Sequence, residues 1–286
     1  MMMRKIKIIL LLAGLLCADV CFAQSGWFWQ NPAPQGHNVT WIKMLSPTLI
    51  YGVGRYGTFI KSTDGGTSWS SEYKVDGSGN YLWSASFLSQ SYGYAVGEFG
   101  MILRTTNSGT SWLPVPSGIA QTLYSISFIN SLTGYVPRGQ GAILKPTDGG
   151  TSWNNIPNNT GVYFFCLNFT SVNTGYANQS GTVYRTTDGG LNWISTNLTG
   201  SQIESICFID NNTGWLCAFN GAVYKTTNTG LNWTYQISNV NSPLNQIQFI
   251  NNNTGWAAGM NGSITRTTDG GTTWIAQTYL HPLTFY

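Results

Sequence analysis

An eight-residue motif recurs six times along the chain at a nearly constant interval. The first copy spans residues 62–69 and reads Ser-Thr-Asp-Gly-Gly-Thr-Ser-Trp, and the six copies end at Trp69, Trp112, Trp153, Trp193, Trp233 and Trp274. Successive motif tryptophans are 43, 41, 40, 40 and 41 residues apart. A period held this closely over six copies predicts a repeat architecture, in which each unit buries its apolar surface against its neighbours.

Every unit has the same internal plan. An alternating segment ends in a large apolar residue, which we call the anchor: Met44, Phe87, Phe128, Phe169, Phe208 and Phe249. An aromatic residue follows about seven positions later, at Tyr51, Tyr94, Tyr135, Tyr176, Trp215 and Trp256. Alternation between turns rich in Gly, Asn and Asp predicts four antiparallel strands per unit. Four strands in about 40 residues make one propeller blade.

We therefore expect an all-β fold, a β-propeller of four-stranded antiparallel blades that fills residues 24–286. Six complete blades are expected at about 37–78, 79–119, 120–160, 161–200, 201–240 and 241–281. Trp27 lies 17 residues before Met44, and 15 to 18 residues separate each motif Trp from the next anchor. Residues 24–36 are thus predicted to be a strand that completes the last blade, and residues 282–286 the start of a truncated seventh blade. The alternative is a six-bladed ring with an extra N-terminal strand.

The N-terminus has the layout of a secretory signal peptide. Three basic residues within 4–7 precede an uncharged, mostly apolar run at 8–18, and Cys21-Phe22-Ala23 places small residues three and one before a cut at Gln24. The 11-residue run is shorter than the ~20 residues that a membrane helix needs. We expect residues 1–23 to be removed, no transmembrane segment in the mature chain, and a secreted, periplasmic or cell-surface location. A lipoprotein signal is the alternative.

Charged residues make up only 8% of the chain, against roughly 25% in an average soluble protein. This composition argues against helical bundles and coiled coils. The net charge of +3 comes mostly from residues 4–7, so we expect no nucleic-acid partner. Three cysteines follow the leader, Cys166, Cys207 and Cys217. An odd number cannot form a complete disulfide framework; either all three are buried free thiols or Cys207 and Cys217 form a bridge.

The repeated motif has a physical rationale as a turn. An Asp or Asn side chain accepts hydrogen bonds from nearby backbone N–H groups, glycine supplies positive φ, and the Trp packs back on its own sheet. The pattern Ser/Thr-x-Asp-x-Gly-x-x-Trp resembles the Asp-box, or BNR repeat, of sialidases and related propellers. Its structural residues are Asp64, Trp69, Asn107, Trp112, Asp148, Trp153, Asp188, Trp193, Asn228, Trp233, Asp269 and Trp274.

A longer pattern is more specific. Phe249-Ile-Asn-Asn-Asn-Thr-Gly-Trp-Ala-Ala-Gly259, followed by Gly262-Ser-Ile-Thr-Arg-Thr-Thr-Asp-Gly-Gly, resembles the photosystem II assembly/stability factor-like propellers. That family has relatives in many non-photosynthetic bacteria, often secreted. The resemblance covers nearly all of residues 27–286 and implies the fold. It does not imply a photosynthetic role, because propellers host many activities.

No constellation of catalytic or metal-binding residues emerges from the sequence. Residues 52–57 match G-x-G-x-x-G, but that dinucleotide fingerprint needs a following helix, and here strands are expected. Arg104, Arg185 and Arg266 share one repeated position rather than forming a sialidase triad, and no carboxylate pair typical of glycosidases is recognisable. The two histidines lie near the chain ends. We expect no enzyme, no cofactor and no metal, and rank a sialidase-like hydrolase third.

Two sets of residues are candidates for binding. A basic residue precedes every motif and would form a ring of positive charge, unless these are simply solvated strand ends: Lys61, Arg104, Lys145, Arg185, Lys225 and Arg266. The hairpin tips between second and third strands vary between repeats, as binding loops on a scaffold do, and include Arg55, Tyr56, Glu98, Phe99, Arg138 and Gln140. We expect a secreted, non-catalytic scaffold that binds a protein partner; the alternative is a glycan-binding module.

Overall fold

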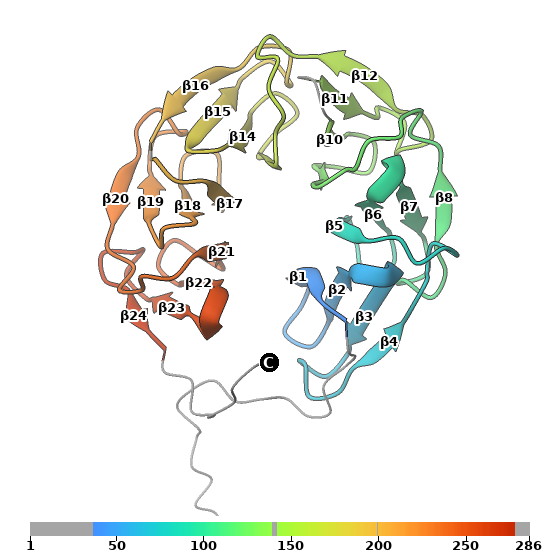
Figure 1. The fold of residues 1–286 in the computed structure, drawn as a ribbon, viewed down its shortest axis with the longest axis horizontal. Coiled ribbons are helices and arrows are strands. Elements are labelled where there is room, and N and C mark those ends of the chain that lie inside the picture. Colours follow the sequence, from blue (N-terminus) through green and yellow to red (C-terminus); the bar gives the residue numbers. More distant parts are fainter. Residues whose placement is uncertain (1–36, 139–141, 199, 278–286) are drawn as a thin grey trace, which may run out of the picture. The chain divides into compact units, whose positions relative to one another are not determined.

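Six antiparallel four-stranded sheets stand in a ring in a computed structural model, which describes residues 37–138, 142–198 and 200–277 (Figure 1). The first strand of each sheet lies nearest the ring centre and the fourth forms the outer rim. The expected fold class, an all-β propeller with six complete blades, is confirmed. The predicted signal peptide at 1–23 and the predicted remnants of a seventh blade, 24–36 and 282–286, lie outside the described residues.

The first three blades are numbered in chain order. The first comprises β1 (Val39–Met44), β2 (Ile50–Gly54), β3 (Thr58–Ser62) and β4 (Ser70–Glu72). The second comprises β5 (Leu82–Phe87), β6 (Gly93–Gly97), β7 (Ile102–Thr105) and β8 (Leu113–Val115). The third comprises β9 (Ser127–Phe128), β10 (Gly134–Arg138), β11 (Ala142–Lys145) and β12 (Asn154–Pro157).

The remaining three blades repeat this order. The fourth comprises β13 (Cys166–Phe169), β14 (Gly175–Gln179), β15 (Thr182–Thr186) and β16 (Ile194–Asn197). The fifth comprises β17 (Ile203–Phe208), β18 (Gly214–Ala218), β19 (Val223–Thr226) and β20 (Thr234–Gln236). The sixth comprises β21 (Leu244–Phe249), β22 (Gly255–Gly259), β23 (Ile264–Thr267) and β24 (Ile275–Ala276).

Helical structure is confined, in the part of the chain that the structure describes, to three 3₁₀ turns between second and third strands. They are η1 (Arg55–Gly57), η2 (Glu98–Gly100) and η3 (Met260–Gly262). No helix in these residues has the length and apolarity needed to cross a membrane.

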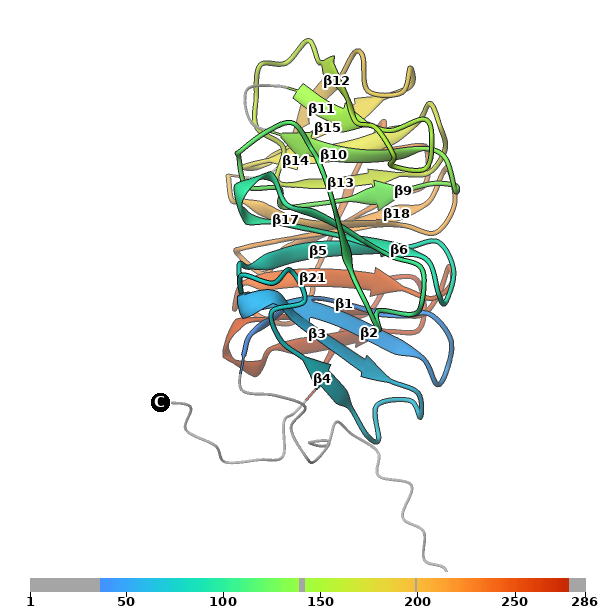
Figure 2. The same cartoon turned by 90° about the vertical axis from the view of Figure 1, so that its right-hand side faces the viewer.

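Burial follows the position of each strand in its blade. The second strands β2, β6 and β18 are buried at every residue. β6 and β18 lie in blades that stand between two other blades of the stack (Figure 2). The outer strands β4 and β16 are largely exposed. Small and apolar residues such as Gly-Tyr-Ala-Val-Gly in β6 thus form the buried second strands, whereas polar residues are found on the exposed outer strands.

The repeated motif forms the turn between third and fourth strands. In the first copy the Asp64 carboxylate accepts hydrogen bonds from the Ser68 N–H at 2.9 Å, the Ser68 hydroxyl at 2.6 Å and the Ser62 hydroxyl at 2.8 Å. These hydrogen bonds lower the pKa of Asp64 to about 2. The Trp69 indole N–H donates to the Gly66 carbonyl at 2.9 Å, so the tryptophan folds back on its own turn. The Asp-box geometry expected from the pattern is therefore present.

Candidate functional site: the channel mouth and the aromatic arc

One repeated position of the innermost strands opens onto the central channel. In four blades it is a β-bulge, where a residue has no partner on the second strand: Thr40, Trp83, Glu204 and Asn245. Tyr124 and Phe165 occupy the same position in the third and fourth blades, four residues before their anchors. All six residues line the channel. Because a bulge redirects its side chain, this position is suited to present side chains at the channel mouth.

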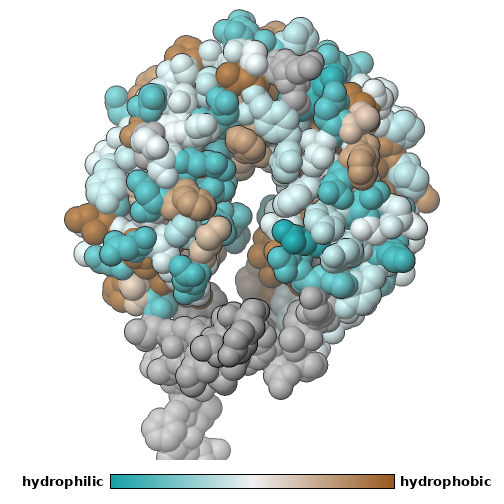
Figure 3. Space-filling model, in the orientation of Figure 1, coloured by the Kyte–Doolittle hydropathy of each residue, from teal (hydrophilic) through white to brown (hydrophobic). Residues whose placement is uncertain are grey.

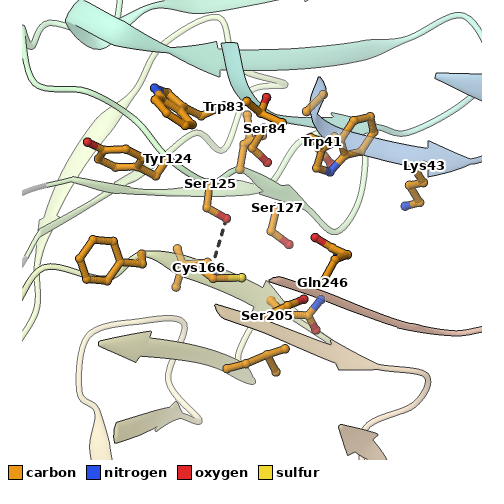
Figure 4. Close-up of a pocket in the computed structure, with 18 of the residues that line it drawn as sticks. Trp41, Lys43, Trp83, Ser84, Tyr124, Ser125, Ser127, Cys166, Ser205 and Gln246 are labelled. Carbon is orange, nitrogen blue, oxygen red and sulfur yellow. Dashed lines mark hydrogen bonds between the residues drawn. The ribbon is translucent and has the colours of Figure 1, made fainter. Parts of the chain in front are cut away.

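The six bulge-position residues divide the mouth into two halves. The second, third and fourth blades contribute an aromatic wall. The Trp83 and Tyr124 ring centroids are 5.3 Å apart (Figure 4), and those of Tyr124 and Phe165 are 6.4 Å apart. The fifth, sixth and first blades contribute Glu204, Asn245 and Thr40 instead. The channel cavity has a volume of about 420 Å³, and the space-filling view shows it open at the ring centre (Figure 3).

Hydroxyl groups below the mouth join neighbouring blades. The Phe128 N–H donates to Ser86 Oγ at 3.1 Å, the Leu167 N–H to Ser125 Oγ at 3.2 Å, and the Phe169 N–H to Ser127 Oγ at 3.4 Å. Each bond joins the inner segment of one blade to that of the next, and in two of the three both residues lie in first strands. The channel wall is therefore held by side chains that the sequence presents as ordinary serines.

Glu204 differs from these engaged groups. Its side chain is half-buried and makes no hydrogen bond or ion pair with any residue that the structure describes. Burial raises the pKa of the Glu204 carboxyl above its ordinary value. A carboxylate that is partly removed from water without a donor is costly, so it marks a place where a ligand can supply the missing partner.

The nearby cysteines are free thiols. Cys166, Cys207 and Cys217 form no disulfide, so the bridge considered between Cys207 and Cys217 is absent from the structure. In the pairing of β17 with β18, Cys217 lies opposite Ser205, while Cys207 lies opposite Trp215. Burial raises the pKa of all three thiols, as expected for cysteines that pack as small apolar residues.

The aromatic wall continues outward over the face that carries the hairpin tips. Tyr81 lies 6.1 Å from Trp83 and 5.3 Å from Tyr56, and Tyr163 lies 5.8 Å from Tyr124, all between ring centroids. We call this continuous set the aromatic arc: Tyr56, Tyr81, Trp83, Tyr124, Tyr163 and Phe165. A groove of about 540 Å³ adjoins it, lined by Phe99, Ala120, Gln121, Thr122, Tyr124, Tyr163 and Phe165.

Two predicted tip residues belong to this face. Tyr56 is 48% exposed and Phe99 is 70% exposed, as expected. Both have left-handed backbone conformations, with φ of 59° and 55°, at the position where the sixth blade carries Asn261. Bulky residues are uncommon at such φ values, and a strained conformation retained at a surface turn motivates a functional hypothesis.

The other predicted tip residues are engaged within the chain. The Arg55 guanidinium lies over the Tyr81 ring, 5.2 Å from its centroid, and Glu98 accepts the Tyr81 N–H at 2.9 Å. The first two hairpins thus converge on Tyr81. Arg138 donates to the side-chain oxygen of Asn155 in its own blade at 3.3 Å. The predicted residue Gln140 lies outside the described residues.

The predicted basic ring packs against the blades. Lys61, Lys145 and Lys225 lie over the second-strand aromatic ring of their own blade, 4.9 to 5.7 Å from its centroid, and Arg266 lies 5.7 Å from that of Trp256. Lys145, Arg185 and Lys225 also donate to the motif turn of the following blade. Arg104 lies opposite Tyr94 in register. Contacts between and within blades account for these positions, while a binding role for the ring stays a prediction.

Sequence reasoning missed the bulge position. Its signal was present, since the column four residues before the anchor reads Thr, Trp, Tyr, Phe, Glu and Asn, whereas neighbouring columns are more uniform. No group of three or more His, Cys, Asp or Glu that could hold a metal occurs among the described residues.

Solved structures similar to this chain include propellers of two kinds. A structure described as YCF48 bound to D1 peptide is 23% identical, with a TM-score of 0.70, over 85% of this chain and 82% of that chain. YCF48 from Cyanidioschyzon merolae is 18% identical, with a TM-score of 0.70, over 88% of each chain. An ancestral GH74 enzyme is 18% identical, with a TM-score of 0.64, over 89% of this chain and 40% of that chain. No curated protein sequence matches the chain.

At these identities the structural likenesses show the fold alone. The sequence comparison goes further, because the family described as photosynthesis system II assembly factor YCF48 matches residues 25–106 and 105–245. The match spans most of the repeats, in agreement with the resemblance of the longer motif pattern. The chain therefore belongs to the photosynthesis system II assembly factor YCF48 family.

Proposed function

We propose that this chain is a secreted, non-catalytic propeller that binds an extended segment of a protein partner along the aromatic arc. The observation that carries the proposal is the pair of exposed, left-handed aromatic residues, Tyr56 and Phe99, beside a continuous series of rings. Exposed aromatic residues in a concave surface are enriched at the energetic centres of protein interfaces. The signal-like residues 1–23 support secretion.

The comparison with a solved structure of the same family also supports peptide binding. One similar propeller was solved as YCF48 bound to D1 peptide, so a peptide is the kind of ligand that a propeller of this family can accept. The groove beside Phe99, of about 540 Å³, has the size of an ordinary ligand site. We propose a peptide segment as the class of ligand and name no particular partner. The D1 peptide is the ligand of the similar structure, whereas the aromatic arc is a feature of this chain.

A catalytic role has less support. Among the described residues that line the channel, Glu204 is the single carboxylate, whereas most glycosidases use two. Arg104, Arg185 and Arg266 lie in three different blades, and each lies opposite the second-strand aromatic residue of its own blade. A glycan-binding module is the second candidate, because the same exposed rings can stack on sugars.

Selection of peptides from a phage-displayed library against the purified propeller tests the proposal. We expect enriched peptides that bind the native protein and bind the Tyr56→Ser/Phe99→Ser variant at least ~10-fold more weakly, since interface aromatics each contribute ~1 to 2 kcal/mol or more. The matched control is Tyr235→Ser, which removes a 56% exposed tyrosine from the outer rim.

The outcomes separate the candidates. Peptides that bind the double variant as tightly as the native protein would place binding elsewhere. Sugars bound on a glycan array, with no peptide enriched, would favour the glycan-binding module instead. The thermal midpoint of each variant establishes that it is folded before its binding is compared.

A further inference from the structure

The channel mouth combines two groups that attract the same kind of ligand. Trp83, Tyr124 and Phe165 present aromatic rings from three consecutive blades, and Glu204 lines the same cavity from the fifth blade. Ring faces attract cations through their quadrupole, most strongly when water is excluded. A carboxylate attracts a cation directly, and more strongly where it is partly buried.

We propose that the channel mouth binds a Lys or Arg side chain of a protein partner, held between the aromatic wall and the Glu204 carboxylate. This inference rests on the proposed function, since it names the side chain that a bound segment inserts beside the aromatic arc. The ammonium or guanidinium group supplies the donors that Glu204 lacks among the described residues. The aliphatic stem of the inserted side chain packs against the rings.

No described cation of this chain already fills the mouth. Lys43 is the basic residue among those that line the channel. It lies three positions after Thr40, the residue that its own strand places at the mouth. Arg55 lies over Tyr81, and Arg138 donates to Asn155. Arg55 and Arg138 therefore have partners other than Glu204.

The polar half of the mouth favours an organic cation over a metal ion. Asn245 of the sixth blade and Thr40 of the first blade are the other polar residues at the bulge position, and the hydroxyl of Thr40 already donates to the Leu82 carbonyl at 2.6 Å. Within the described residues no cluster of His, Cys, Asp or Glu could complete a metal site. One carboxylate in a cavity that is also lined by aromatic rings instead matches the charge of one basic side chain.

Saturation-transfer and titration NMR with small probes test the inference. The probes are N-acetyl-lysine methylamide and its uncharged, similarly shaped analogue N-acetyl-norleucine methylamide. We expect the lysine probe to bind the native protein, and Glu204→Gln to weaken it at least ~10-fold, because the acceptor loses the negative charge that attracts the ammonium group. Trp83→Ala is expected to weaken it ~3-fold or more through the lost cation–π contact.

The matched control is Glu72→Gln, which makes the same change of charge at an exposed residue of β4. It should leave binding of the lysine probe unchanged. Equal affinities for the lysine and norleucine probes, or an unchanged affinity in a folded Glu204→Gln variant, would overturn the inference. Circular dichroism and the thermal midpoint report whether Glu204→Gln is folded.

The phage-display experiment separates this inference from the proposed function. Peptides that need Tyr56 and Phe99 but contain no basic residue and bind Glu204→Gln normally would overturn the inference while supporting the proposed function. A lysine probe that binds through Glu204, with no enriched peptide, would leave the cation site standing and refute peptide binding along the arc.

Discussion

The ring of Phe169 lies flat against the ring of Tyr135, with 3.5 Å between centroids and 4° between planes. Tyr135 belongs to the third blade and Phe169 to the fourth, and Trp193 meets Phe169 edge-on at 6.0 Å and 85°. The same arrangement recurs at Phe128, Phe208 and Phe249. Among the described residues no strand of one sheet pairs with a strand of another. Stacked rings, assisted by the serine hydroxyls, therefore join the blades.

Replacing Phe169 by Ala should destabilise the propeller strongly. The side chain is buried between Tyr135 and Trp193, and truncation of a buried Phe typically costs ~3 to 5 kcal/mol in the free energy of unfolding. Urea denaturation measures this. Leu191→Ala removes a 52% exposed leucine of the same blade and should cost less than ~0.5 kcal/mol. Similar losses for the two variants would contradict the role assigned to the stack.

The glycine that opens the second strand in the second to sixth blades leaves space for the anchor ring. A Cβ added at Gly175 would lie 2.5 Å from Cε1 of Phe169. We expect Gly175→Ala to lower the free energy of unfolding by ~1 to 3 kcal/mol through overpacking. Gly200→Ala is the matched control, because nothing lies within 4 Å of the added methyl group. A Gly175→Ala variant with the native thermal midpoint would show that the ring can shift freely.

The basic ring should contribute to the joining of blades. Lys225 lies over Trp215, 5.1 Å from its centroid, and donates to the Gly270 carbonyl of the sixth blade at 2.9 Å. We expect Lys225→Met to cost ~1 to 2 kcal/mol. Arg266→Met, at an exposed residue for which no bond to a further blade is described, should cost less. Chemical denaturation compares the two, and equal losses would argue against the contact with Gly270.

The same positions test the binding role expected from the sequence. Reversing the charge of Arg104 and Lys225 together should leave peptide binding unchanged if the aromatic arc is the binding surface. Binding lost in a variant that is still folded would instead assign a binding function to the ring.

The Asp-box carboxylates should make stability fall in acid. Hydrogen bonds lower the pKa of Asp64 and Asp269 from 3.8 to about 2. A carboxyl group whose pKa is lower in the folded state stabilises the fold above its unfolded pKa, and this contribution is lost as the pH falls toward the folded value. The thermal midpoint should therefore fall between pH 4 and about pH 2.

The Asp64→Asn/Asp269→Asn variant isolates these two groups. It converts both turns to the Asn form found at Asn107, where the Asn side chain still accepts the Ser111 N–H at 2.9 Å. The thermal midpoint of this variant should fall less between pH 4 and about pH 2. A fall equal to that of the native protein would assign the acid sensitivity to other groups.

The repeat period was sufficient to predict most of the fold from the sequence. Anchors such as Phe169, second-strand aromatics such as Tyr135 and motif tryptophans such as Trp193 recur at fixed offsets, and each offset corresponds to one strand and one turn. Local chemistry sufficed for the Asp-box as well, because its hydrogen bonds join residues no more than four apart. Such local and periodic information is readable without coordinates.

Contacts between blades were decided only by the tertiary structure. Lys225 and Gly270 lie 45 residues apart, and nothing local to Lys225 indicates that its ammonium group meets the next turn rather than a partner. Likewise, Glu204 shares a cavity with Trp83 because the curvature of the ring brings the first strands of separate blades around one channel. Sequence alone determined the blade and its turns, since these depend on neighbours along the chain. The two-sided channel mouth exists only because the curvature of the ring makes distant copies of one repeat position face a common space.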